Sequence, residues 1–412
     1  GGVIRSAGNL TLRAGTDGIG GTINIDADQT GVVGPIVSGL IADGNLLVDA
    51  SAAGLDDFSN VRNNGGTGIG QNAVGGTINI DINGGGDLVV GGTARFMADA
   101  QGGKGETQNG SAQAGNINLD ISSGTFNVTG TTFFGTRAIA AQNLKALGNG
   151  PGLVGSDSVG GNVNMALSGG VVTTGNMFVD LGAVATAGES AGGVQSNDAT
   201  SGAFDLTVTG GSHVINDLSV NALADASTGS FDAAGTGISG FARSGGANFL
   251  IGGGSLTINS DLTTGFSTYG ISPASAADRV SVTSRNGGSL TVTGTLGINT
   301  IALDGVDTAI SNSGSIAILV DNAALTTGGL NLNSSARPNN RFSFFSSDEG
   351  RDFQAGDISL IAQNGGTFAS GFSSFSANAT GNDTNGGNGT GGDIFIHANN
   401  GSMNFTNSVF ID

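Results

Sequence analysis

Cysteine and tryptophan are absent from this 412-residue chain, and tyrosine occurs only at Tyr269. Without cysteine the chain has no disulfides, no thiolate nucleophile and no cysteine-based metal site. The two histidines, His213 and His397, lie far apart in the sequence and form no zinc-ligand pair. Lysine and glutamate, both good helix formers, are almost absent, and nearly all the acid is aspartate, which favours turns. These absences predict a fold of strands and turns.

Basic residues are too few to balance the acidic ones, and the formal net charge is −19. Phosphate binding needs clustered lysine and arginine, so we expect no nucleic-acid partner. Anionic membrane surfaces are disfavoured for the same reason. No stretch approaches the roughly 20 apolar residues that cross a bilayer, so we expect no membrane span.

Glycine is abundant, with 78 residues, but it follows no Gly-X-Y order and there are only four prolines, which excludes collagen. Glycine pairs instead precede a short alternating segment, Gly-Gly-Thr-Ile-Asn-Ile-Asp, at 20–26 and again at 75–81. Alternation of apolar and polar residues predicts a strand with one buried face. Weaker copies begin at Gly115, Gly160, Gly202, Gly246, Gly356 and Gly392.

Two further strand-like segments follow each glycine-led segment, as at 87–90 and 96–100. Equivalent first-segment positions are unevenly spaced: Ile23 to Ile78 is 55 positions, Ile78 to Ile117 is 39, and Phe204 to Phe249 is 45. The excess falls in inserts rich in Gly, Ser, Asn and Ala, at about 51–74, 101–114, 148–159, 185–201, 225–245 and 379–390. Insertions at one point of a repeat lie on one edge of a solenoid.

A period near 40 with three short strands predicts an all-β parallel β-helix, or β-solenoid, of about ten coils of three strands. We expect residues 1–412 to form one continuous solenoid, either an excerpt of a longer chain or a filament subunit. Glycine is expected at the corners because it adopts positive φ without strain. A β-propeller fits less well, because it needs four antiparallel strands per blade. One segment, 136–147, is open to two interpretations, a short helix capped by Thr136 or a continuation of the third strand.

Polar residues recur at one outward position of the first segment. Their amides would hydrogen-bond from coil to coil as a structural ladder. The residues of this predicted polar ladder are Asn24, Asn79, Asn118, Asn164 and Asp205. The next outward position carries Asp26, Asp81 and Asp120, and calcium could relieve their mutual repulsion. They are weak calcium candidates, because a solvated turn explains them equally well.

The segment from Arg337 to Phe353 concentrates charge and aromatic residues. It is interpreted either as a core coil with a charged loop or as a contact patch, since arginine and aromatic side chains are favoured in interfaces. The contact-patch residues are Arg337, Arg341, Phe344, Phe345 and Arg351. No residue constellation predicts catalysis. Aspartate pairs on adjacent coils could cleave a polysaccharide, but aromatic sugar platforms are scarce and phenylalanine is expected in the interior.

The glycine-led Ile-Asn-Ile-Asp and Asp-Leu-Val-Val strands, the uneven inserts, the missing cysteine and the acidic balance resemble large exported bacterial β-helix proteins. Autotransporter passenger domains and filamentous-haemagglutinin-type adhesins are the nearest families. The resemblance is one of style over nearly the whole chain, and it implies a right-handed β-helix at the bacterial cell surface. It carries over no catalytic residue, and no secretion signal, haemagglutinin secretion domain or membrane barrel is recognisable within these 412 residues.

We therefore expect a non-enzymatic extracellular structural or adhesive β-solenoid that builds a cell-surface fibre or filament. Its expected partners are copies of itself, end to end or side by side, other cell-surface components, or carbohydrate. No cofactor is expected, apart from the weak case for calcium. The alternative is a polysaccharide-binding or polysaccharide-cleaving β-helix, either a lyase or hydrolase or a protein similar to a phage tailspike.

Overall fold

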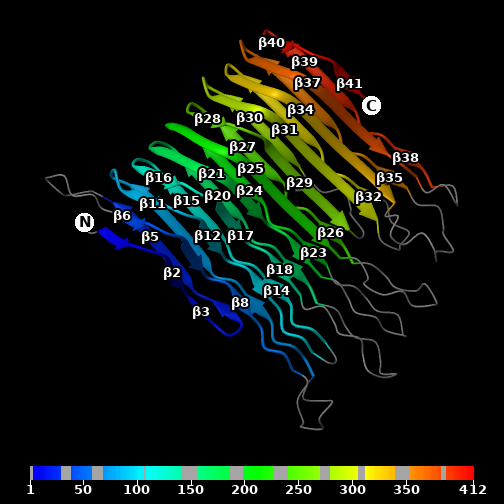
Figure 1. Ribbon diagram of the computed structural model, residues 1–412. Helices are drawn as coiled ribbons and strands as arrows, with labels where there is room; N and C mark the ends of the chain where they lie inside the picture. The colour runs from blue at the N-terminus through cyan, green and yellow to red at the C-terminus, as the bar shows by residue number, and fades with distance from the viewer. Residues whose placement is uncertain are drawn as a thin grey trace.

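The computed structural model describes residues 3–28, 39–57, 68–105, 108–140, 156–185, 198–226, 240–269, 279–304, 311–338, 352–381 and 387–412. These residues are all-β and contain no helix (Figure 1). Their strands form long sheets in which every pairing is parallel, apart from one small antiparallel hairpin. The architecture is consistent with a β-solenoid. The colours in Figure 1 advance steadily from one end of an elongated stack to the other, with the N- and C-termini at opposite ends.

The glycine-led segments form a ten-stranded parallel sheet in strict sequence order. Its strands are β5 (Thr22–Asp28), β10 (Thr77–Asn83), β15 (Ile117–Ile121), β20 (Val163–Leu167), β24 (Phe204–Val208), β27 (Ala247–Ile251), β30 (Val280–Arg285), β33 (Ile316–Asp321), β36 (Ile358–Gln363) and β39 (Ile394–Asn399). We call the stretch from one of these strands to the next a repeat.

The second and third segments of each repeat belong to a 21-stranded sheet, here called the large sheet. In its N-terminal half these segments are separate strands: β1 (Val3–Ser6), β2 (Leu10–Arg13), β6 (Gly39–Ala42), β7 (Leu46–Asp49), β8 (Ala52–Ala53), β11 (Asp87–Val90), β12 (Ala94–Met97), β13 (Ala100–Gln101), β16 (Thr125–Val128), β17 (Thr132–Gly135) and β18 (Ala138–Ile139). Further along, longer strands often combine them: β21 (Val171–Asp180), β22 (Ala183–Val184), β25 (Ser212–Asp225), β28 (Ser255–Ile258), β29 (Leu262–Tyr269), β31 (Ser289–Asp304), β34 (Ala324–Pro338), β37 (Thr367–Ala379), β40 (Ser402–Phe405) and β41 (Val409–Ile411).

Short strands precede the glycine-led segment and form two small sheets. A seven-stranded sheet contains β3 (Gly15–Thr16), β4 (Ile19–Gly20), β9 (Ala73–Val74), β14 (Ala112–Gln113), β19 (Ser158–Val159), β23 (Ala199–Thr200) and β26 (Ala242–Arg243). A three-stranded sheet contains β32 (Ser311–Asn312), β35 (Phe353–Gln354) and β38 (Gly389–Thr390). Several of these strands lie inside stretches that the sequence pattern predicts to be inserts, so the inserts are shorter than expected.

Pairing in the ten-stranded sheet follows the predicted repeat with one correction. Sequence spacing aligns Phe204 with Phe249, whereas the structure pairs Phe204 with Ala247 and Leu206 with Phe249. A slip of two residues keeps every side chain on its predicted face, so the apolar pattern alone does not reveal it. Residues 136–140 contain β18 and not the start of a helix, so the strand interpretation is right there; 141–147 lie outside the described residues.

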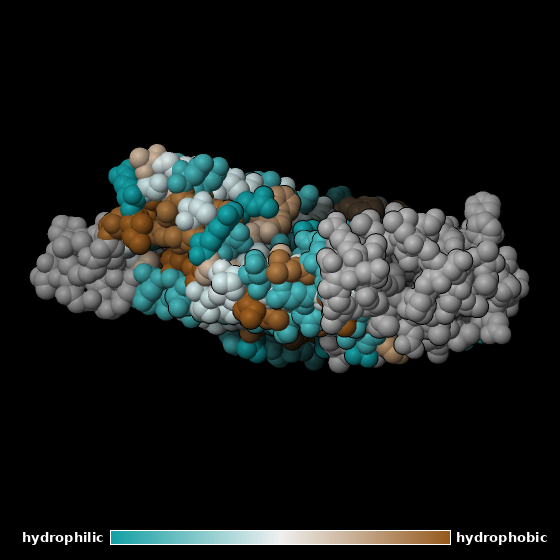
Figure 2. All heavy atoms as spheres, turned by 90° about the horizontal axis from the view of Figure 1, so that it is seen from below, coloured by the Kyte–Doolittle hydropathy of each residue, from teal (hydrophilic) through white to brown (hydrophobic). Residues whose placement is uncertain are grey.

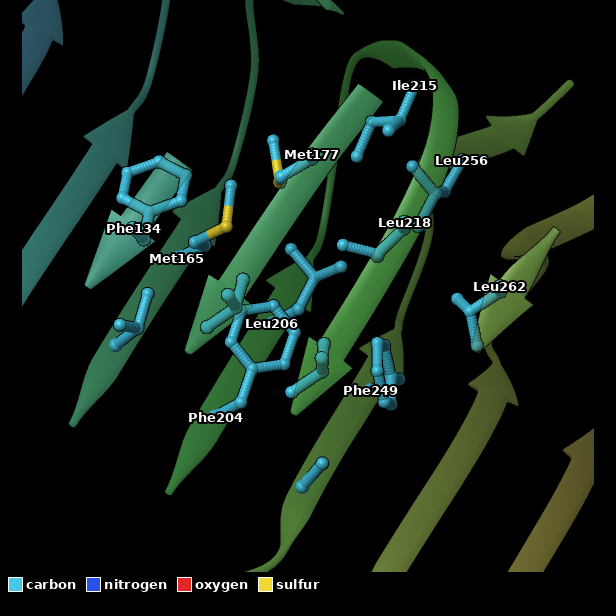
Figure 3. Packing of buried hydrophobic residues seen from close by; sticks show 14 of the residues in the cluster. Phe134, Met165, Met177, Phe204, Leu206, Ile215, Leu218, Phe249, Leu256 and Leu262 are labelled. Atoms are coloured by element: carbon cyan, nitrogen blue, oxygen red, sulfur yellow. The ribbon is translucent and has the colours of Figure 1, made fainter. Parts of the chain in front are cut away.

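Inward side chains fill the space between the ten-stranded sheet and the large sheet as one continuous hydrophobic core. Figure 3 shows part of it, where Phe204 and Leu206 from one sheet face Leu218 from the other. The aromatic rings also pack between repeats, and those of Phe96 and Phe134 stack 5.2 Å apart. Each fully buried aliphatic or aromatic side chain stabilises the fold by about 1.5–3 kcal/mol.

Alanine fills a second, narrower part of the interior. On the large sheet Ala52, Ala100 and Ala138 pair in register, and Ala73 and Ala112 pair on the seven-stranded sheet. These side chains form one buried cluster, and a similar alanine cluster follows in the next repeats. Because a methyl group is small, the two sheets can approach closely at this edge. The strands of this alanine-filled edge flank three of the intervals that lie outside the described residues. These intervals fall between β8 and β9, between β18 and β19, and between β22 and β23.

Gly246 adopts the predicted positive φ, 77°, but three other glycines that open repeats are required for a different reason. Gly76, Gly115 and Gly161 are absent from the positive-φ residues. A Cβ on each of them would overlap the carbonyl oxygen of the glycine in the preceding repeat. Close backbone approach therefore selects glycine at this corner. Positive φ occurs at the turn after the ten-stranded sheet, where Asn322 and Asn364 adopt φ of 48° and 53°.

Candidate functional site

The predicted polar ladder lies on the outer face of the ten-stranded sheet. Asn79 Nδ2 donates to Asn24 Oδ1 at 2.8 Å, Asn118 donates to Asn79 at 2.8 Å, and Asn164 donates to Asn118 at 2.9 Å. Asp205 pairs with Asn164 in the register, but as a carboxylate it brings no amide donor to the ladder. Side-chain hydrogen bonds therefore join four repeats through a column of asparagines, Asn24, Asn79, Asn118 and Asn164.

The calcium candidates Asp26, Asp81 and Asp120 also stack in register on adjacent strands. Burial raises the pKa of Asp120, and the neighbouring Asp81 carboxylate raises it further. Asn83 Nδ2 donates to Asp81 Oδ1 at 3.0 Å. Within the described ranges, no three His, Asp or Glu side chains are grouped so that they could hold a metal ion.

Aspartate and asparagine also join the repeats at their corners. Asn45 accepts from the Thr93 amide at 2.8 Å, and Asp99 accepts from the Arg137 amide at 2.7 Å. The same contact links Asn162 to the Ala203 amide at 2.9 Å. Each side chain satisfies a backbone donor one repeat further along, as a cap does at a helix end. The short Asx side chain has the length for this contact, which explains why the acid of this chain is nearly all aspartate.

The predicted contact patch lies mostly outside the described residues. Arg341, Phe344, Phe345 and Arg351 all fall there, and only Arg337 is described. Arg337 is exposed on β34, where it pairs in register with Leu303 of β31.

Phenylalanine is not confined to the interior, which corrects the sequence expectation. Phe96, Phe126 and Phe134 are buried as predicted, but Phe178 is 38% exposed on the outer face of the large sheet. Phe133 is its register partner in the preceding repeat, and the Arg95 guanidinium lies 4.9 Å from the Phe133 ring centre. Alternation places Phe133 outward because its neighbour Phe134 points inward (Figure 3). The pattern Thr-Phe-Phe-Gly contains this signal, but it does not show what lies beside Phe133.

An open groove of about 490 Å³ lies next to these two rings. It crosses β17, β21, β25, β29 and β31, which are neighbours in the large sheet (Figure 1). Two outward rows line it. The first row runs in register from Phe133 through Phe178 and Ser219 to Thr263, and the second runs from Asp180 through Asn221 and Gly265 to Asn299. Sequence reasoning missed this site because its residues come from five separate repeats.

Charge at the groove is confined to its N-terminal end. Asp180 Oδ2 lies 3.6 Å from Arg137 Nε, and the Gly182 amide donates to Asp180 Oδ1 at 3.3 Å. Burial raises the pKa of Asp180, while Arg137 and the Gly182 amide lower it in part. The remaining polar lining is uncharged. Ser219, Asn221 and Thr263 have no side-chain hydrogen-bond partner among the described residues, and Asn299 accepts from Asn333 at 3.3 Å.

His213 is a buried polar residue in an otherwise apolar column. It pairs with Leu256, and Nδ1 accepts from the Val172 amide at 3.2 Å. Nε2 lies 2.9 Å from the Gly210 carbonyl oxygen, so this nitrogen carries the proton. Burial lowers the pKa of His213, and the bond to Gly210 opposes the shift. The contacts satisfy the ring as a neutral structural group.

The outer faces combine hydrophilic and hydrophobic residues. Figure 2 shows hydrophobic residues gathered between hydrophilic ones on the face seen from below. At the N-terminal end Leu10, Leu12 and Ile23 are only partly buried, and at the C-terminal end Phe410 and Ile411 are exposed. The described residues include no helix with the length and apolar character needed to cross a membrane.

Comparison of the chain with protein-family models, with curated proteins and with solved structures gives no match.

Proposed function

We propose that this protein is a non-enzymatic, extracellular structural and adhesive β-solenoid that builds a fibre or filament at the bacterial cell surface. The observation that supports the proposal is the ten-stranded sheet, in which equivalent strands from β5 to β39 pair in sequence order. Each repeat adds the same strands in the same place, so the outer faces present polar columns at regular intervals. Weak contacts repeated along such columns add by multivalency.

In this proposal the chain winds as a right-handed coil of about ten turns. A strand-to-strand spacing of about 4.8 Å makes the rod about 45 Å long. The continuous core, the asparagine ladder and the Asx corner bonds support a stiff rod, because each joins a repeat to its neighbours. The apolar side chains at the two ends would be covered by the next copy in a filament or by further repeats of a longer chain.

Electron microscopy of the purified protein tests the rod and its assembly. We expect single rods of the calculated length at low concentration and longer filaments as the concentration rises. Beads coated with the protein then test adhesion, by their attachment to bacteria, to epithelial cells and to one another. A chain that forms neither filaments nor attached or aggregated beads would contradict the proposal.

The polysaccharide-cleaving alternative predicts a different result. Release of reducing ends or unsaturated sugars from polysaccharides incubated with the protein would support that enzyme and overturn the non-enzymatic proposal.

A further inference from the structure

We propose that the groove across β17, β21, β25, β29 and β31 binds a neutral polysaccharide or oligosaccharide. The inference rests on the proposed adhesive function, because it names the class of ligand that one outer face of the fibre would hold. It is carried by one juxtaposition: the exposed ring of Phe178 and the half-buried ring of Phe133 lie beside uncharged hydrogen-bonding side chains in an open groove.

The phenylalanine pair forms an apolar wall. Phe178 exposes its ring to solvent, although an exposed ring of this size gains free energy when another surface covers it. Arg95 from the neighbouring repeat packs against Phe133, so Phe178 is the more exposed of the two rings that line the groove. The C–H face of a pyranose ring suits an aromatic surface, because its hydrogens carry slight positive charge and the aromatic face is negative.

The floor is open because small residues occupy its centre. A Cβ added at Gly265 would find its nearest neighbour, Asn221 Oδ1, at 3.4 Å, and a Cβ at the adjoining Gly297 would have 3.7 Å of clearance. Neither glycine is needed for close packing there, unlike Gly115. Gly265 lies between Asn221 and Asn299 in the second row, and the space above it gives the groove its depth.

The polar lining matches the hydroxyl groups of a sugar. Asn221 supplies a carbonyl and an amide, and the hydroxyls of Ser219 and Thr263 donate and accept. Sugar hydroxyls also donate and accept, so these groups can pair in several arrangements. A purely apolar ligand would leave them without partners, which costs free energy for each group that becomes buried.

Charge favours a neutral sugar over an acidic one. The chain carries a net charge of −19, and Asp180 lies at the groove. Its neighbour Arg137 is already engaged by Asp180 and, through its backbone amide, by Asp99. An acidic polysaccharide would therefore be repelled by Asp180, and the described residues that line the groove include no Lys or Arg to offset that repulsion.

Affinity electrophoresis in gels that contain a soluble polysaccharide tests the inference. The neutral probes are mannan, xyloglucan, galactan and dextran, and alginate serves as the acidic contrast. We expect at least one neutral probe to retard the protein while alginate does not. Phe178→Ala should weaken retention about tenfold or more, because it removes the aromatic wall. Gly265→Val should abolish retention by filling the floor.

A control variant separates the groove from the rest of the surface, and a second variant tests the polar row within it. Phe241 is also exposed, at 42%, and lies near Arg243, but it directly precedes β26 of the seven-stranded sheet and does not line the groove, so Phe241→Ala should bind like the unmodified protein. Asn221→Ala tests the polar row with an exposed residue whose loss leaves the core intact. Melting temperatures establish that each variant is folded before its retention is compared.

The outcomes distinguish this inference from the proposed function. Bead attachment without retention by any neutral probe would overturn the saccharide groove and leave the adhesive function standing. Retention that is equal in Phe178→Ala, Gly265→Val and the unmodified protein would also overturn the groove. Groove-dependent retention without bead attachment or filaments would support the groove and overturn the adhesive function.

Discussion

A Cβ placed on Gly115 would overlap the carbonyl oxygen of Gly76, the residue that precedes it in the stack of repeats. The same relationship joins Gly161 to Gly115 and Gly202 to Gly161. The repeats therefore meet at this corner backbone to backbone. No side chain fits between them, so the spacing of these repeats depends on a column of residues without Cβ.

Gly115→Ala is expected to destabilise the fold by about 3 kcal/mol, because the backbone must separate to admit the methyl group. Gly182→Ala is the matched control, since Gly182 is also buried but its added Cβ would have its nearest neighbour at 3.4 Å. Urea unfolding followed by circular dichroism measures both variants. Equal midpoints for the two alanine variants would contradict the steric account.

Asn118 both donates to Asn79 and accepts from Asn164, so Asn118→Ala removes two side-chain hydrogen bonds. Each is expected to contribute about 1 kcal/mol, which predicts a loss of about 2 kcal/mol in the free energy of unfolding. Asn221→Ala, in the groove, should change stability by less than about 0.5 kcal/mol because its side chain is exposed and unpaired. If both substitutions are equally mild, the ladder does not stabilise the stack.

Because of His213, we expect the free energy of unfolding to fall as the pH drops through the neutral range. Its pKa in the folded protein lies below the ordinary value of 6.5, so below that pH the unfolded chain takes up a proton that the folded chain resists. The unfolded state then binds more protons, and unfolding becomes easier. The free energy of unfolding, measured by urea titration between pH 8 and pH 5.5, should decrease in the unmodified protein.

His213→Leu supplies the control for that pH dependence. The variant should be less stable at pH 8, because the Val172 amide loses its acceptor, but its stability should depend less on pH. Parallel pH profiles for the two proteins would show that another group causes the decrease.

Thr264 is an inward residue whose hydroxyl is buried without a hydrogen-bond partner in the described structure. It pairs in register with Val220 and Ile298, so Thr264→Val continues an aliphatic column. Removing an unsatisfied hydroxyl should stabilise the fold by about 1 kcal/mol. Thr136→Val is the contrast, because the Thr136 hydroxyl donates to the Gly161 carbonyl at 2.7 Å, and this variant should be less stable. Calorimetric melting temperatures that shift in the same direction would refute the distinction.

Local patterns in the sequence predict most of the strand structure. Alternation in Thr-Ile-Asn-Ile-Asp determines which residues face inward, since successive side chains of a strand point to opposite faces. The recurrence of that pattern also places Asn24, Asn79 and Asn118 in one column, because identical strands align best when their apolar faces coincide. The all-β class and the absence of helix in the described residues follow from the same signals.

The exact register of some repeats and the close contacts at their corners were accessible only from the tertiary structure. The pairing of Phe204 with Ala247 differs from the sequence alignment by two residues, which leaves the buried pattern unchanged. The short alanine strands have too few residues for any periodicity to identify them. The glycine pairs suggested turns, but carbonyl groups about 40 residues earlier in the chain are what exclude a side chain there.

The sequence by itself determined the strands, their inward faces and the stacking of one repeat on the next, because these depend on alternation and recurrence along the chain. Only the tertiary structure decided that Phe178, Asn221 and Asn299 line one groove. Each of them occupies an ordinary outward position in its own repeat. Their proximity arises from the register of strands separated by about 40 residues, and no local pattern encodes that register to the residue.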